Sequence, residues 1–256
     1  MINIFNEYNI GLALSGGGAR GFAHIGVLMA LEKFDMRPNI ISGVSAGAIV
    51  GSMYASGMSP IDILKHLTEI YSLIKHPNIS LPKEGLFKLN KFGKLLDEWL
   101  PIKNIEETRI PLIICATDLD RGKPIGWSKG NIAERVMASS SIPVVFSPIK
   151  INGVNYVDGG VLRNLPAWAI RKKCRKLIGS NCSPIEKNYE HKSSIIDTAT
   201  RAFSLMAKSN TLQDILLCDY IIQSNEVSRY KMYDISAMKK ITIHGYNSAC
   251  RVLEKI

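Results

Sequence analysis

The sequence contains five cysteines, and their arrangement suits neither of the two structural uses of this residue. They are Cys115, Cys174, Cys182, Cys218 and Cys250, an odd number with no C-x-x-C pair. No histidine stands at the spacing that would complete a zinc site with them. We therefore expect the reduced thiols of a cytoplasmic protein, without a disulfide framework or a bound metal.

Signals for export and for membrane spanning are also lacking. Residues 1–10 contain Glu7 but no lysine or arginine, which makes them a poor signal peptide. Residues 38–61 contain no charged residue and are long enough to cross a bilayer, but four glycines and five serines lower their hydrophobicity. We expect a buried strand, turn and helix in this segment.

Acidic residues are in the minority, with 22 Asp and Glu against 32 Lys and Arg, so the net charge is +10. Such a charge attracts anionic surfaces, both lipid head groups and nucleic acid. The densest basic run, residues 171–176, lacks interleaved aromatic residues that would stack on bases, and we expect a solvated helix end there. The charge thus favours peripheral contact with an anionic membrane, such as the inner face of the cell membrane, over a nucleic acid partner.

Short apolar runs alternate with helical patterns along most of the chain. Strands are predicted over residues 10–14, 40–41, 111–116, 177–178 and 220–222, with helices over 21–34, 59–74 and 131–138 and a hairpin turn at Asn152-Gly153. This alternation predicts a three-layer α/β/α fold with a central, mostly parallel sheet. With 256 residues, of which 46% are hydrophobic, the chain suits a single domain spanning residues 1–256.

The sharpest motif is a G-x-S-x-G, Gly43-Val44-Ser45-Ala46-Gly47, between a predicted strand and a predicted helix. A serine in such a strand-turn-helix corner projects from strained backbone, and the flanking glycines let neighbouring chain approach closely. The setting predicts a nucleophile elbow, with Ser45 as the nucleophile and Gly43 and Gly47 shaping the turn.

A glycine-rich loop, Gly16-Gly17-Gly18-Ala19-Arg20-Gly21, follows the first predicted strand. Its amides could face the pyrophosphate of a dinucleotide or the negative oxygen of a tetrahedral intermediate. A dinucleotide site needs an acidic residue at the end of the second strand, but Ser45 stands there and Asp35 precedes that strand. The sequence therefore favours acyl chemistry over a nicotinamide cofactor.

A third motif, Asp158-Gly159-Gly160, directly follows the strand that leaves the hairpin turn. Two glycines after an aspartate permit close approach by another loop, although an ordinary turn has the same pattern. A carboxylate with a pKa of about 4 is a weak base for a serine hydroxyl. Asp158 can act as a base only if a partly desolvated site raises its pKa.

The order of these motifs, G-G-G-x-R-G, G-x-S-x-G and D-G-G, resembles the patatin-like phospholipase family. Three further segments look like segments of that family, namely Ala116-Thr117-Asp118-Leu119, the stretch from Ala138 to Pro143, and Asn164-Leu165-Pro166. The likeness runs from about residue 10 to residue 180. We expect residues 190–256 to complete or decorate the same domain.

The resemblance implies a serine acyl hydrolase with a Ser-Asp dyad, in which Ser45 is the nucleophile and Asp158 the general base. It also implies an oxyanion hole in the glycine loop, whose residues are Gly16, Gly17, Gly18 and the loop-fixing Arg20. The implied substrate is a lipid ester, as for a phospholipase A or a lysophospholipase. Cleavage would pass through an acyl-enzyme and use neither a metal nor an organic cofactor.

Alternatives stay open at this level. A Ser-His-Asp triad would use His191 or His244, whereas His24 is expected to be a packing or capping residue. The same acyl-enzyme could serve an acyltransferase, and the fold could also belong to a catalytically silent lipid-binding or regulatory protein. Residues 86–100 alternate apolar residues with lysines at helical spacing, which suits a core-packed helix or a helix in contact with lipid.

Overall fold

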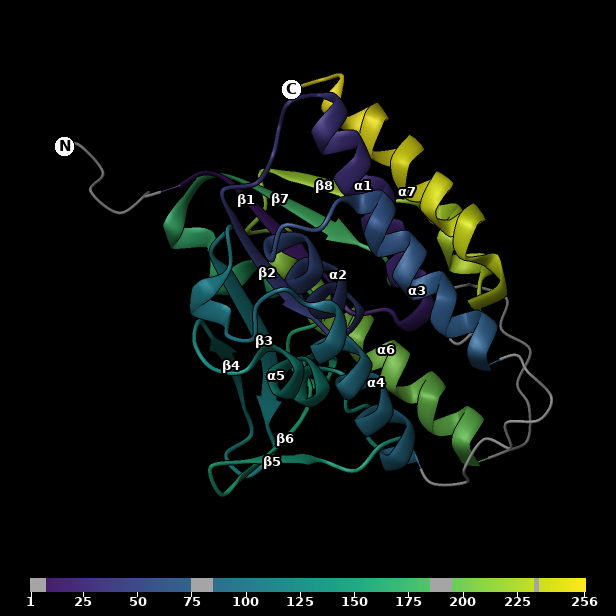
Figure 1. Cartoon of the computed structure of the whole chain (residues 1–256). Coiled ribbons are helices and arrows are strands. Elements are labelled where there is room, and N and C mark those ends of the chain that lie inside the picture. Colours follow the sequence, from purple (N-terminus) through teal and green to yellow (C-terminus); the bar gives the residue numbers. More distant parts are fainter. Residues whose placement is uncertain (1–7, 75–84, 185–194, 233–234) are drawn as a thin grey trace.

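A single eight-stranded sheet forms the centre of the molecule (Figure 1). The computed structural model describes residues 8–74, 85–184, 195–232 and 235–256. The strands are β1 (Tyr8–Leu14), β2 (Ile40–Val44), β3 (Leu112–Asp118), β4 (Lys123–Trp127), β5 (Ile149–Ile151), β6 (Val154–Asp158), β7 (Cys174–Asn181) and β8 (Tyr220–Gln223). Their order is β5-β6-β3-β2-β1-β7-β8, and β4 pairs with β3 beside this path.

The sheet is mostly parallel, as the alternation of strands and helices predicts. Parallel pairs join β1 to β2 and β7, β2 to β3, and β7 to β8. Antiparallel pairs join β3 to β4 and β6, and β5 to β6. The predicted hairpin turn is confirmed between β5 and β6, where Asn152 and Gly153 both have positive φ angles, of 49° and 85°, as a tight turn of this kind requires.

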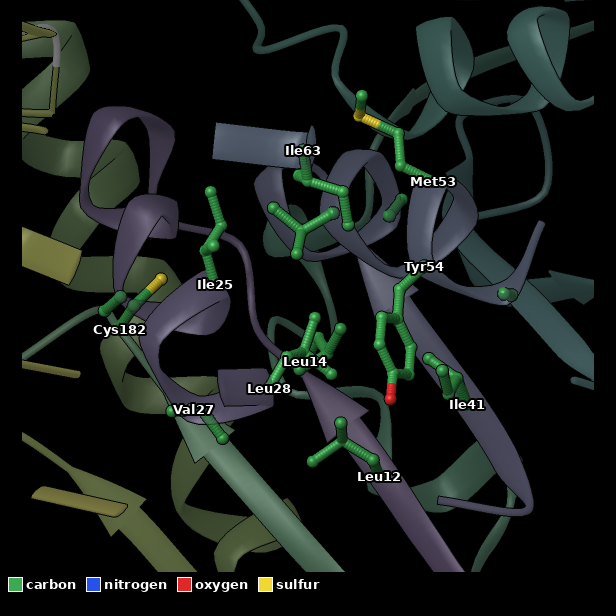
Figure 2. Packing of buried hydrophobic residues seen from close by; sticks show 14 of the residues in the cluster. Leu12, Leu14, Ile25, Val27, Leu28, Ile41, Met53, Tyr54, Ile63 and Cys182 are labelled. Carbon is green, nitrogen blue, oxygen red and sulfur yellow. The ribbon is translucent and has the colours of Figure 1, made fainter. Parts of the chain in front are cut away.

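One face of the sheet carries the larger hydrophobic core. The α-helices of the described residues are α1 (Phe22–Lys33), α2 (Ala46–Ala55), α3 (Pro60–Ile74), α4 (Gly85–Trp99), α5 (Ile132–Ser139), α6 (Ile195–Ile215) and α7 (Met238–Leu253). Leu12 and Leu14 of β1 and Ile41 of β2 pack with Leu28 of α1 and Tyr54 of α2 (Figure 2). Burial of these apolar side chains holds the helices on the sheet.

The opposite face carries a smaller core, because side chains along a strand alternate between the two faces. Ala13, between Leu12 and Leu14, belongs to this second cluster together with Leu165 and Ile170. Those two residues flank the 3-10 helix Pro166–Ala169, and residues at the end of α6 pack against the same cluster. The segment that follows β6 therefore forms one wall of the fold and returns the chain to β7.

The C-terminal helix α7 packs directly against α1 (Figure 1). Glycine makes this close approach feasible on both helices. A Cβ atom on Gly26 of α1 would collide with the Thr242 carbonyl, and one on Gly245 of α7 would collide with the Ala23 carbonyl. The last part of the chain is thus fitted to the first helix, while β8 extends the sheet beside β7.

The predicted helix starts and stops agree well with α1, α3 and α5, but two local expectations were wrong or incomplete. The basic run 171–176 is a 3-10 helix, Arg171–Lys173, that leads into β7, where Arg175 and Lys176 are exposed. The second half of the run is the start of β7, because Cys174 and the residues from Leu177 onward are buried in the sheet. Strand β4 was missed, since its exposed and half-buried residues lack an apolar run.

Residues 38–61 form β2, α2 and the start of α3, which confirms the buried strand, turn and helix predicted for this uncharged stretch. Within the described part of the chain, no helix combines the length and hydropathy that a membrane crossing needs. In α4, Leu96 is buried in the larger core while Lys91 and Lys94 are exposed, so this part of the helix is packed on the core.

Candidate active site

Ser45 occupies the sharp turn between β2 and α2. Its φ of 52° and ψ of −119° lie outside the regions that residues other than glycine usually adopt. A Cβ atom on Gly47 would collide with the Leu14 carbonyl, and one on Gly43 would lie 2.5 Å from the Gly47 carbonyl oxygen. Gly47 therefore lets this turn, the predicted elbow, lie tightly against β1, and Gly43 lets α2 approach β2.

Ser139, the last residue of α5, is hydrogen-bonded to the backbone of the elbow and of β3. The Ser45 amide donates to Ser139 Oγ at 2.8 Å, and Ser139 Oγ donates to the Cys115 carbonyl of β3 at 2.6 Å. Ser139 is fully buried. Sequence reasoning included Ser139 in a family-like segment but missed this contact, because nothing local shows which backbone group a buried serine will bind.

The sheet register brings Asp158 next to the elbow. Val44, which precedes Ser45, pairs with Cys115 on β3, and the next β3 residue, Ala116, pairs with Asp158 at the end of β6. The Asp158 amide donates to the Ser141 carbonyl at 2.9 Å, which fixes the strand end. Two residues far apart in the chain thus lie on opposite sides of β3, at the same level of the sheet.

The Asp158 carboxyl is buried and sparsely hydrogen-bonded. Its Oδ1 atom accepts from the Gly160 amide at 2.8 Å, while Oδ2 is buried without a hydrogen-bond partner among the described residues. Burial raises the pKa of Asp158 to about 7, against the opposing effects of the Gly160 amide and the nearby Ser45 side chain. The carboxyl therefore has the desolvated surroundings that a carboxylate base for a serine requires.

The glycine loop after β1 has two backbone amides without a hydrogen-bond partner among the described residues. The Gly16 amide donates to the Asn164 carbonyl at 3.1 Å and the Ala19 amide to the Met232 carbonyl at 2.6 Å. The amides of Gly17 and Gly18, between these two, have no hydrogen-bond partner in the described part of the chain. Such amides are able to bind a negatively charged oxygen.

Arg20 ties the glycine loop to chain that is distant in sequence. Its Nε atom donates to the Tyr230 carbonyl at 2.7 Å, and Nη1 donates to the Pro184 carbonyl at 3.0 Å. Through these two backbone carbonyls the guanidinium group joins the loop to two other segments. This placement agrees with the loop-fixing position that the family resemblance implies for Arg20.

Ser45 and Asp158 line one small pocket, with a volume of about 360 Å³ including the part open to solvent. The glycine loop also lines it, through Gly16, Gly17, Gly18 and Arg20. Sequence reasoning missed the apolar side of the pocket, which is made by Ile142, Phe203, Ala207 and Met232. Phe203 and Ala207 are four residues apart on α6, a helical spacing visible in the sequence, but nothing local relates this face to Ser45.

No histidine of the described residues lines this pocket. His24 is buried, with Nδ1 2.8 Å from Ser180 Oγ and Nε2 2.8 Å from the Ser15 carbonyl oxygen, so it is a packing residue as expected. His244 lies on α7, with Nε2 3.3 Å from the Tyr230 hydroxyl. His191, the other triad candidate, lies outside the described residues.

Comparison with known proteins places this site in a family. Residues 12–170 match the family model of the patatin-like phospholipases. The chain belongs to the patatin-like phospholipase family. The matched range contains the glycine loop, the Ser45 elbow and the Asp158 turn, so the resemblance inferred from these motifs is confirmed.

This patatin-like chain is also similar to curated proteins of two kinds. The chain is 33% identical over 160 residues to an NTE family protein of Mycobacterium tuberculosis, which covers 61% of this chain and 44% of that protein. It is 28% identical over 185 residues to lysophospholipase NTE1 of Debaryomyces hansenii, which covers 70% of this chain and 12% of that protein. The chain thus spans less than half the length of these curated relatives.

Among solved structures, VipD from Legionella pneumophila shares the fold, with a TM-score of 0.61 and 17% identity over 97% of this chain and 67% of that chain.

The family match of the patatin-like chain ends at residue 170, before α6 and α7 begin. Phe203 and Ala207 of α6 nevertheless line the pocket, and the Met232 carbonyl fixes the glycine loop. Residues beyond the matched range therefore contribute directly to the site.

Proposed function

We propose that the chain is a serine acyl hydrolase that cleaves carboxylic esters of lipids, with Ser45 as nucleophile and Asp158 as general base. The observation that carries this proposal is the shared pocket of Ser45, Asp158 and the Gly17 and Gly18 amides, which have no hydrogen-bond partner among the described residues. A base is most effective when its pKa lies near the working pH. Burial raises the pKa of Asp158 to about 7, which meets this condition.

The proposed reaction begins when the Asp158 carboxylate takes the Ser45 hydroxyl proton as Ser45 Oγ attacks the ester carbonyl carbon. The negative oxygen of the tetrahedral intermediate binds the Gly17 and Gly18 amides. The intermediate collapses, the ester C–O bond breaks, and the alcohol leaves with the proton held by Asp158. Water then gives a proton to Asp158 as it attacks the acyl-enzyme carbonyl carbon. The bond from that carbon to Ser45 Oγ breaks, Asp158 returns the proton to Oγ, and the fatty acid leaves. These steps use only protein groups and water.

We propose only two of the three glycine amides as oxyanion donors. The Gly16 amide already donates to the Asn164 carbonyl, so we assign the donor role to Gly17 and Gly18. Gly16 contributes through close packing, since a Cβ atom there would lie 2.5 Å from Asn164 Oδ1. Arg20 would support the donors indirectly, through its two backbone contacts.

A lipid ester is the substrate class that the pocket and the relatives favour. Ile142, Phe203, Ala207 and Met232 offer an apolar surface beside the catalytic groups, where an acyl chain could lie. The relative from Debaryomyces hansenii is named a lysophospholipase, in line with a lysophospholipid or phospholipid substrate. The net charge of +10 favours contact with the anionic surface on which such substrates are found.

We also propose that residues 190–256 belong to the same domain as the motif-bearing part. Strand β8 continues the central sheet, α7 packs on α1, and α6 lines the pocket. An isolated fragment lacking these elements would expose the apolar side chains that they cover. The catalytic unit is accordingly the whole chain, and experiments should use it intact.

The proposal is tested by hydrolysis of a short-chain nitrophenyl ester with wild type, Ser45→Ala and Asp158→Asn. Both substitutions should lower kcat by about 1,000-fold or more. Matched controls are Ser52→Ala, a buried serine of α2, and Asp118→Asn, a buried carboxyl at the end of β3. Both lie outside the pocket lining, so folded control variants should keep most of the activity.

Two further variants separate the dyad from a triad. Activity should persist in His191→Ala and His244→Ala, because Asp158 acts on Ser45 without an intervening imidazole. Loss of several orders of magnitude in either variant would overturn the dyad. Adding glycerol or a lysolipid as acceptor distinguishes hydrolysis from acyl transfer, since a transferase would give transacylated product at the expense of free fatty acid.

A further inference from the structure

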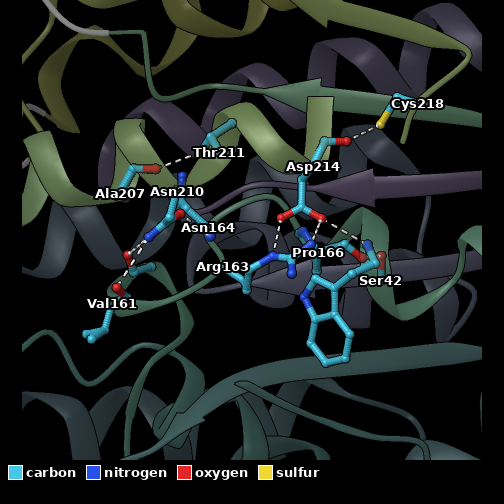
Figure 3. A network of polar contacts seen from close by, with 12 residues as sticks. Ser42, Val161, Arg163, Asn164, Pro166, Ala207, Asn210, Thr211, Asp214 and Cys218 are labelled. Atoms are coloured by element: carbon cyan, nitrogen blue, oxygen red, sulfur yellow. Dashed lines mark hydrogen bonds and ion pairs between the residues drawn. The ribbon is translucent and has the colours of Figure 1, made fainter. Parts of the chain in front are cut away.

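Asn210 of α6 contacts two parts of the loop that follows β6, one at Val161 and one at Asn164 (Figure 3). Its Nδ2 atom donates to the Gly160 carbonyl at 2.8 Å and to the Val161 carbonyl at 3.3 Å. Its Oδ1 atom accepts from the Asn164 amide at 2.8 Å. One half-buried side chain thus contacts both sides of the loop that follows β6.

These contacts continue into the catalytic groups on each side. The Gly160 amide donates to Asp158 Oδ1 at 2.8 Å, so the peptide group next to the Asn210 contact holds the base. Asn164 bonds to Gly16 twice: its carbonyl accepts from the Gly16 amide at 3.1 Å, and its Nδ2 donates to the Gly16 carbonyl at 3.4 Å. Asn210 is therefore linked to the base through Gly160 and to the glycine loop through Asn164.

We propose that Asn210 is a positioning residue that sets the Asp158 carboxylate relative to the oxyanion-binding amides. This inference rests on the proposed function and adds a residue outside the range matched by the family, which ends at residue 170. A primary amide suits the position, because it can donate to carbonyls on one side and accept from an amide on the other. Without it, the loop from Gly160 to Asn164 would keep the Arg163–Asp214 ion pair to α6 but lose the hydrogen bonds from α6 to Gly160, Val161 and Asn164.

The inference predicts a pH effect that general loosening of the helix would not produce. Burial raises the pKa of Asp158, and the groups that lower it are the Gly160 amide in its own turn and the Ser45 side chain of the elbow. Arg20 is the charged group of the glycine loop that lines the same pocket. A looser Gly160 would weaken its bond to Asp158, so the pKa of the base and the midpoint of the pH profile should rise.

A neighbouring residue provides the control. Thr211 is the next residue of α6, is buried, and donates its hydroxyl only to the Ala207 carbonyl within the same helix, at 2.7 Å. Thr211→Val removes that hydroxyl at nearly constant volume and leaves the loop contacts intact. The ion pair of Arg163 with Asp214, at 2.7 Å, continues to hold α6 to the loop in every variant (Figure 3).

The experiment measures kcat, KM and the pH profile of nitrophenyl ester hydrolysis for wild type, Asn210→Ala, Asn210→Asp and Thr211→Val. A displacement of about 1 Å in a catalytic group can cost about 100-fold in rate, so kcat of Asn210→Ala should fall by that order while KM changes little. The midpoint of its profile should rise by about half a pH unit or more. Asn210→Asp keeps the size and the acceptor but loses the donors, and should show the same two effects if the alanine variant does not fold.

The outcomes are distinct. An inactive wild type would refute the proposed function itself, whereas an active wild type with unchanged Asn210 variants would refute only the positioning inference. The positioning inference would also be refuted if kcat fell equally in the Asn210 variants and in Thr211→Val, with no shift of the pH midpoint. Such a result would show that any change in α6 has the same effect.

Discussion

Replacing Asp158 by asparagine should abolish ester hydrolysis and, at alkaline pH, make the folded protein more stable. Burial raises the pKa of this carboxyl from 3.8 to about 7, with the Gly160 amide and the Ser45 side chain opposing the change. Between these two pH values the folded state holds a proton that the unfolded chain has released. The stabilisation from that proton is complete below the unfolded pKa and is lost as the pH rises through about 7.

The magnitude follows from the shift of about three pH units. At 1.36 kcal/mol per unit, the ionised carboxyl costs the folded state roughly 4 kcal/mol at pH values above 7. About 2 to 3 kcal/mol of this cost develops between pH 5 and pH 8. The amide of Asp158→Asn has its own effect on the free energy of unfolding, but this effect is the same at pH 5 and pH 8. It therefore cancels when the difference between mutant and wild type is compared at the two pH values.

Urea unfolding at pH 5 and pH 8 measures this difference. The free energy of unfolding of Asp158→Asn minus that of wild type should be about 2 to 3 kcal/mol larger at pH 8 than at pH 5. Asp118→Asn is the control: burial would raise the pKa of Asp118, but its contacts with Arg121 lower it, so its stabilising effect is fully present at both pH values. An equal effect of Asp158→Asn at pH 5 and pH 8 would refute the raised pKa of the base.

Three more variants, one of them a double substitution, test other parts of the account. Ser139→Ala should lower kcat by about tenfold and cost about 1 to 3 kcal/mol in urea unfolding, because the Ser45 amide loses its acceptor; unchanged kcat would refute the anchoring of the elbow. Ala207→Leu should fill the apolar side of the pocket and shift preference among nitrophenyl esters toward shorter acyl chains; a uniform change for all chain lengths would contradict that assignment. Neutralising Lys91 and Lys94 should weaken binding to anionic vesicles more at low salt than at high salt, and equal binding at both would exclude a lipid contact of α4.

The parts of the site that the sequence predicts are those built by local backbone. The Ser45 elbow needs glycine at positions 43 and 47 within a strand-turn-helix segment, so the G-x-S-x-G motif in that setting predicts the backbone conformation of the turn. The glycine loop and the Asp158 turn are likewise continuous segments with recognisable composition. The glycine loop and the elbow follow β1 and β2, neighbouring parallel strands whose carboxyl ends lie at one edge of the sheet, so their meeting could be expected. The place of Asp158 could not, because β6 runs antiparallel to β3.

The contributions that the sequence did not predict depend on contacts between distant segments. Asn210 contacts the loop after β6 across about 50 residues of chain, and only the packing of α6 shows this. The Gly16 amide is satisfied by Asn164, a partner that motif spacing does not specify. The same reason explains β4, which owes its strand conformation to pairing with β3 and not to an apolar pattern of its own. Single-domain organisation and the catalytic roles stay predictions for experiment.

The central claim is that Ser45 is a nucleophile activated within this pocket, and covalent labelling tests it most directly. Wild-type protein is treated with a fluorophosphonate probe, digested, and mapped by mass spectrometry. The account predicts one modified peptide, carrying the probe on Ser45, with no labelling in Ser45→Ala and strongly reduced labelling in Asp158→Asn. Labelling of another residue, or equal labelling of Ser45→Ala, would contradict it.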